Sequence, residues 1–157
     1  MTNLYISEIL FDSKAKDIDF SQYPFSLPVV KNLSKIKLES NITFFVGENG
    51  TGKSTLLEAV ATNYGFNSEG GSKNFTFHTQ ESHSNLFKHI LLSKGAIPPK
   101  DGYFFRAESF YNVATDIEKM DSEPSFDLKI IEAYGGTSLH KQSHGESFLS
   151  LILNRFF

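Results

Sequence analysis

Alternating apolar and polar residues predict strands near the start of the chain. The alternation occurs in NLYISEI (3–9) and in SKIKLES (34–40), with the period of two that marks a strand with one exposed face. We expect these strands to pair antiparallel. A third run, NITFFVG (41–47), is continuously apolar and ends at a glycine, which is typical of a strand buried on both faces.

Helical spacing dominates the rest of the chain. After Lys53, apolar residues recur on one helical face, and Gly65 follows as a C-cap. The residues of this face are Leu56, Leu57, Val60 and Tyr64. Two further helices are expected, one from Ser84 to near Gly95 with Leu86, Phe87, Ile90 and Leu91 inward, and one carrying Phe110, Val113, Ile117 and Met120. Residues 125–136 also favour a helix, whereas 74–79 and 103–106 favour short strands.

Helices interleaved with strands predict an α/β layered domain. The chain has 157 residues, which is enough to bury one core, so we expect a single domain over residues 1–157.

Composition narrows the class of protein. The net charge of -3 gives no general attraction to nucleic acid or to anionic membranes, and the absence of cysteine excludes disulfides and thiolate metal sites. The first residues lack the basic and apolar regions of a secretory signal, and no apolar run is long enough to span a bilayer. We therefore expect a cytoplasmic protein.

The stretch GENGTGKST (47–55) has the spacing of a phosphate-binding loop: glycine, four residues, then Gly-Lys-Ser. Glycines allow successive backbone N–H groups to turn inward around phosphate oxygens, and the following helix directs its positive dipole end to the same point. The motif predicts binding of a nucleoside triphosphate with Mg²⁺. Its members are Gly47, Asn49, Gly50, Thr51, Gly52, Lys53, Ser54 and Thr55, with Lys53 on the β- and γ-phosphates and Ser54 on the metal.

A second polar turn precedes the last apolar helical pattern. Ser143, Gly145 and Glu146 combine a hydroxyl, a glycine N–H and a helix N-terminus, which together suit an anion. The alternative is an ordinary capping box, in which Ser143 and Glu146 bond each other's backbone N–H. The sequence leaves both interpretations open.

Four segments together resemble a family of small, soluble bacterial ATPases. They are YPFSLPVVKNL (23–33), FFVGENGTGKSTLLEAVA (44–61), FFRAESFYNVATDIE (104–118) and YGGTSLHKQSHGESFLSLILNRF (134–156). The family comprises AAA-type, ABC-like ATPases of the ABC superfamily, related to the ATP-binding heads of SMC and DNA-repair ATPases. In this resemblance QSHGES (142–147) stands where the signature motif Leu-Ser-Gly-Gly-Gln stands, although Gln142 and His144 depart from it.

The resemblance implies a layered P-loop fold and a head-to-tail homodimer. Each ATP would lie between the phosphate loop of one subunit and Ser143, Gly145 and Glu146 of the other. For the residue that bonds Mg²⁺ or the attacking water, we favour Glu108 over Gln80, so that Lys53 and Glu108 are the catalytic candidates.

Adenine would stack on an aromatic residue upstream of the loop. Tyr23 and Phe25 are the candidates, and the alternative for each is a place in the hydrophobic core.

The family pattern continues beyond the signature helix with an Asp-Glu pair and a histidine, and nothing follows Phe157 here. We therefore expect a domain that is truncated or split before the Walker B strand, with weak hydrolysis on its own. We also expect an apolar face around Leu149, Ile152 and Phe156-Phe157 that a partner chain supplying the missing half would cover.

Two rival functions remain at this stage. A small P-loop kinase usually clamps the transferred phosphoryl group with several arginines, and this chain has Arg106 and Arg155 alone. A non-catalytic module that binds ATP and docks on a partner without turnover would need none of the missing residues.

Overall fold

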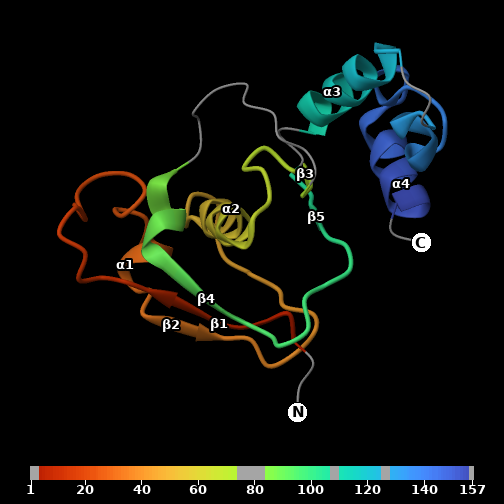
Figure 1. Cartoon of the computed structure of the whole chain (residues 1–157). Helices are drawn as coiled ribbons and strands as arrows, with labels where there is room; N and C mark the ends of the chain where they lie inside the picture. Colours follow the sequence, from red (N-terminus) through yellow and green to blue (C-terminus); the bar gives the residue numbers. More distant parts are fainter. Residues whose placement is uncertain (1–3, 74–83, 107–109, 125–127, 156–157) are drawn as a thin grey trace. The chain divides into compact units, whose positions relative to one another are not determined.

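A computed structural model describes residues 4–73, 84–106, 110–124 and 128–155. The contacts divide the chain into two compact units, and Figure 1 colours them along the sequence. The first unit is Met1–Ser68 with Ser72–Phe104, and the second is Glu69–Gly71 with Phe105–Phe157. The strand predicted at 74–79, the candidates Gln80 and Glu108, and Phe156-Phe157 lie outside the described residues.

The first unit contains a three-stranded antiparallel sheet in the order β2-β1-β4 (Figure 1). Its strands are β1 (Ile6–Phe11), β2 (Lys35–Lys37) and β4 (Ile90–Lys94). Glu8 lies opposite Lys37, and its carboxylate pairs at 2.7 Å with the ammonium group of Lys35. The two antiparallel strands predicted from alternation are therefore confirmed.

Helix α2 (Lys53–Tyr64) packs into the core of this unit. It ends where Gly65 takes a left-handed φ of 105°, and the N–H of Phe66 bonds the carbonyl of Ala61 at 3.0 Å. The predicted start and C-cap are confirmed. The predicted apolar face is wrong in part, because Leu56 is fully buried whereas its neighbour Leu57 is exposed.

The helix predicted from Ser84 to near Gly95 is wrong. The chain forms a 3₁₀ helix, η1 (Asn85–His89), and then strand β4, which pairs with β1. Ile90 is buried and Leu91 is exposed, as the pleat of a strand requires. Pairing with a strand far along the sequence outweighs the local helical spacing here.

The prediction of a buried strand at 41–47 is also wrong. Ile42, Phe44 and Val46 are 69%, 82% and 88% exposed, and the segment belongs to neither sheet. A strand buried on both faces needs paired neighbouring strands and covering layers, and none of the described strands pairs with this segment. Phe45 alone packs against the core.

Helix α1 (Pro28–Lys31) lies between β1 and β2 in the sequence. It begins with proline, whose fixed φ suits a first helical turn. Val30 is fully buried, and Phe25 and Leu33 join it in the core beside Leu56 of α2. This anchoring brings α1 against the start of α2.

The second unit is built from helices. They are α3 (Phe110–Ser122), the 3₁₀ turns η3 (Ile130–Tyr134) and η4 (Leu139–Lys141), and α4 (His144–Arg155). Phe110, Val113 and Ile117 of α3 are buried as predicted, whereas Met120 is exposed. Residues 130–134 form a 3₁₀ turn in place of the longer helix predicted over 125–136.

Two short strands, β3 (Gly71–Ser72) and β5 (Tyr103–Phe104), form a separate two-stranded sheet. The strand predicted at 103–106 is confirmed in part. This mixture of helices and small sheets fits the α/β class, and the layered P-loop arrangement and the single domain over 1–157 remain predictions.

Leu56→Ala tests the role of α2 in the core. It should lower the free energy of unfolding by about 2–5 kcal/mol, because it leaves a cavity at a fully buried position. Leu57→Ala is the matched control, and it should cost well under half as much because Leu57 is exposed. Urea denaturation followed by circular dichroism measures both, and equal losses would contradict the packing described.

Candidate functional site

The loop before α2 depends on glycines at two positions. Gly50 has a φ of 81° and Gly52 a φ of 98°, both in the left-handed region that other residues avoid. Gly52 is the N-cap of α2, so that the loop passes directly into the first helical turn at Lys53. Glycine at both positions therefore avoids the strain that a side chain would bring, and phosphate binding by this loop stays a prediction.

The ammonium group of Lys53 is folded over the loop. It donates to the carbonyl oxygens of Gly47 at 2.9 Å and Glu48 at 2.7 Å. The Thr51 hydroxyl also donates to the Glu48 carbonyl, at 2.9 Å. Lys53 thus lies at the mouth of the loop, where it can exchange carbonyl oxygens for phosphate oxygens.

The other predicted loop residues follow the same turn. Asn49 and Ser54 are exposed, and Thr55 is half-buried in the first turn of α2. The backbone N–H groups of a helix's first turn have no partner within the helix. Exposed Ser54 beside them offers its hydroxyl to a metal ion bound with a phosphate.

Helix α1 packs directly on the loop. The N–H of Val29 donates to the Thr51 carbonyl at 3.2 Å. A Cβ at Gly52 would lie 2.7 Å from Cγ1 of Val29 and 3.1 Å from Cδ1 of Leu27. The absence of a side chain at Gly52 is therefore what allows α1 to hold the loop, and sequence reasoning missed this contact.

A pocket of about 430 Å³ opens beside the loop. Thr51 and Lys53 line it together with the side chains of α1 and of the segments around it. The remaining lining residues are Pro28, Val29, Asn32, Leu33, Lys35, Ile36, Phe45, Val46 and Gly47. Most of this wall is apolar, so the pocket joins the loop around Lys53 to a hydrophobic recess.

Neither predicted adenine-stacking residue lines this pocket. Phe25 is 3% exposed and packs edge-on against His89, with ring centroids 5.0 Å apart, so the core alternative holds for it. Tyr23 is 62% exposed. The recess instead presents Asn32, whose amide nitrogen donates to the Pro28 carbonyl at 2.9 Å.

The second polar turn lies in the second unit and forms a capping box. Ser143 donates to the Glu146 carboxylate through its N–H at 2.9 Å and its hydroxyl at 2.7 Å. In return, the Glu146 N–H donates to the Ser143 hydroxyl at 3.4 Å. Gly145 is exposed, and nothing lies within 4 Å of the position a Cβ would take. The turn thus caps α4, and its role toward a partner's nucleotide stays a prediction.

The Ser143 contacts also act on the charge of Glu146. Hydrogen bonds from the hydroxyl and then from the backbone N–H of Ser143 lower the pKa of the Glu146 carboxyl. Since these bonds favour the ionised form in the folded state, the cap stabilises the fold above the ordinary glutamate pKa. That contribution is lost as the pH falls through the lowered pKa.

Within the described ranges, no group of three or more His, Cys, Asp or Glu side chains is arranged to hold a metal ion. None of the described helices has the length and apolarity needed to cross a membrane.

Ser143→Ala should raise the pKa of Glu146 back toward its ordinary range, because the stronger of its two causes is removed. A carbon-detected titration of the Glu146 carboxyl measures the midpoint. Ser122→Ala, whose hydroxyl bonds the Lys119 carbonyl instead, is the control and should leave the midpoint unchanged. An unshifted midpoint in Ser143→Ala would contradict the capping box.

A comparison with protein families identifies the chain. A family model described as an AAA domain matches residues 18–131, which is more than half of the 157 residues. No curated protein and no solved structure matches the chain. The family indicates nucleotide binding and ATPase-type activity, with general use of ATP and Mg²⁺. The matched range includes the loop Gly47–Thr55 and the helix α1 that packs on it. Because the match covers more than half of the chain, the chain belongs to the AAA domain family.

Proposed function

We propose that this chain binds ATP in the first unit, with the triphosphate in the loop from Gly47 to Thr55. The observation that carries the proposal is the position of the Lys53 ammonium group, held over the loop by the carbonyls of Gly47 and Glu48. The positive end of α2 and the glycine turns at the same place favour a polyphosphate over other anions.

The pocket beside the loop suits the base and ribose of the same nucleotide. Its apolar wall, which includes Val29, Leu33 and Ile36, can cover the faces of a flat base. The amide nitrogen of Asn32 donates one N–H to the Pro28 carbonyl, so its side-chain oxygen can accept from the base while the second N–H can donate to it. An exocyclic amine such as that of adenine supplies the matching donor.

The residues that act on the phosphates can be assigned in the same proposal. Lys53 neutralises the β- and γ-phosphates, and the Ser54 hydroxyl holds Mg²⁺, which would neutralise phosphate charge in the same place. Glu108 is our proposed group for orienting the attacking water. The family supports ATPase-type activity. We propose in addition that Lys53, Ser54 and Glu108 carry out the hydrolysis.

A second copy of the chain completes the site in this proposal. Ser143, Gly145 and Glu146 of one subunit would contact the nucleotide held by the other, in a head-to-tail dimer. The exposure of the turn at the start of a 12-residue helix supports this role. Glu146 uses both Ser143 donors in the capping box, so the carboxylate must turn away before Ser143 can bond a phosphate. An interaction module that binds ATP without turnover uses the same contacts and differs only in the absence of phosphate release.

Lys53→Ala should weaken ATP binding by about 10- to 100-fold, because it removes charged hydrogen bonds to phosphate. Fluorescence titration with a labelled ATP analogue in the presence of Mg²⁺ measures the affinity. Lys88→Ala is the matched control, since it removes the same charge from an exposed site in the same unit.

Affinity that is equal in Lys53→Ala and wild type would contradict the proposal. Sedimentation velocity on the same samples tests the proposed dimer, and a phosphate-release assay tests the proposed hydrolysis. ATP-dependent dimers with phosphate release support the ATPase, and ATP-dependent dimers without it support the interaction module. Monomers at saturating ATP would contradict the dimer.

A further inference from the structure

Two aromatic rings form a platform where α2 ends. Gly65 reverses the chain after Tyr64, and Phe66 then stacks on Tyr64 with ring centroids 6.0 Å apart and an angle of 19° between the rings. A Cβ at Gly102 would lie 2.7 Å from Cζ of Phe66, so the backbone of Gly102 supports this ring from one side. Both rings are half-buried, which leaves part of each accessible to a ligand.

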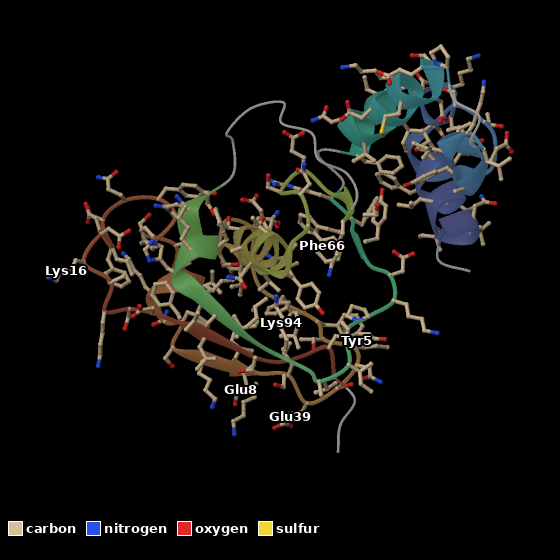
Figure 2. All side chains as sticks on the ribbon, viewed as in Figure 1. Tyr5, Glu8, Lys16, Glu39, Phe66 and Lys94 are labelled. Atoms are coloured by element: carbon tan, nitrogen blue, oxygen red, sulfur yellow. The ribbon has the colours of Figure 1, made fainter. Side chains whose placement is uncertain are left out.

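Two lysines converge on this platform, Lys73 directly after β3 and Lys94 at the end of β4. The ammonium nitrogen of Lys73 lies 4.3 Å from the centroid of the Tyr64 ring and 5.3 Å from that of Phe66. The ammonium nitrogen of Lys94 lies 4.6 Å from the Tyr64 ring. Figure 2 labels Phe66 and Lys94 in the first unit. Both lysines are exposed.

Neither lysine has a carboxylate partner among the described residues. The ion pairs in this part of the chain are Lys35 with Glu8 and His89 with Asp17. Two ammonium groups held near one ring repel each other. The ring faces and the carbonyl end of α2 offset part of that repulsion. A bound anion would offset the rest, so the arrangement is suited to a negatively charged ligand.

We propose that Tyr64, Phe66, Lys73 and Lys94 form a binding site for single-stranded nucleic acid. In the complex the two ammonium groups move off the ring faces onto backbone phosphates, and a neighbouring base takes their place on the rings, as in other sites that combine cations with aromatic rings. An acidic peptide matches the charges but leaves the rings unused. A duplex matches the charges but keeps its base faces inside its own stack.

This site is separate from the nucleotide loop. Lys53 begins α2 and Tyr64 ends it, and a helix of 12 residues is about 18 Å long. The proposal goes beyond the ATP-binding function and does not depend on it, because none of its four residues lines the pocket beside the loop. Loss of one activity with retention of the other distinguishes failure of the two proposals.

Fluorescence anisotropy with a labelled oligo-deoxythymidine tests the site in the full 157-residue chain. The wild type should bind with an affinity that falls steeply between roughly 50 and 200 mM salt. The double variant Lys73→Ala/Lys94→Ala should bind at least about tenfold more weakly. Its slope of log affinity against log salt should be smaller by about 1.4, since each lost phosphate contact removes about 0.7.

A second double variant, Tyr64→Leu/Phe66→Leu, tests the platform and should weaken binding at least about fivefold with an unchanged salt slope. Lys14→Ala/Lys16→Ala is the control for net charge. Both lysines are exposed in the same unit, Figure 2 shows Lys16 away from Phe66 and Lys94, and the variant should bind like the wild type. Circular dichroism and binding of the labelled ATP analogue verify that each variant is folded. If a lysine-to-alanine variant does not fold, Lys73→Gln/Lys94→Gln replaces it.

Three outcomes would overturn the proposal. The first is no oligonucleotide binding by the wild type at low salt. The second is equal weakening in the control and the cluster variants, which would indicate an effect of net charge alone. The third is competition by poly-glutamate or by duplex DNA of equal length as strong as competition by unlabelled single strand.

Discussion

The burial of α2 is the constraint on which the site depends. Leu56 and Ala59 have almost no exposed surface, and the carboxylate of Glu58 in the same helix accepts the N–H of Ser84 at 3.0 Å. These contacts fix the helix in the first unit, and the helix in turn fixes Lys53 at its first position. Because the loop runs directly into this helix, the direction of its N–H groups and of the dipole follows from the packing of residues that never touch a ligand.

The loop is held from its other side by α1. Val30 and Leu33 are buried in the same core as Leu56, and the N–H of Val29, next to Val30 in α1, donates to the Thr51 carbonyl. The same four-residue helix supplies both the brace on Gly52 and part of the pocket wall. A nucleotide in the pocket would therefore contact α1 with its base and α2 with its phosphates, so binding would tie together two elements that share one core.

Features set by a few adjacent residues could be predicted from the sequence. The glycine turns of the loop, Lys53, the cap at Gly65 and the contact between Ser143 and Glu146 each depend on a stretch shorter than ten residues. Features set by distant pairing could not. Residues 90–94 have helical spacing and form a strand because β1 offers a partner. Residues 41–47 are mostly apolar, and none of the described strands pairs with them. The pocket was missed for the same reason. Helix α1 has only four residues, and it forms part of the pocket wall through contacts with the loop that are distant in the sequence.

Amide chemical shifts during a titration with Mg²⁺-ATP test the central claim most directly. The claim predicts saturable shifts at Gly50, Gly52, Lys53 and Ser54, together with shifts at Asn32 in the pocket wall. If ATP at millimolar concentration left the loop amides unchanged in a folded protein, the assignment of this loop to phosphate binding would be wrong.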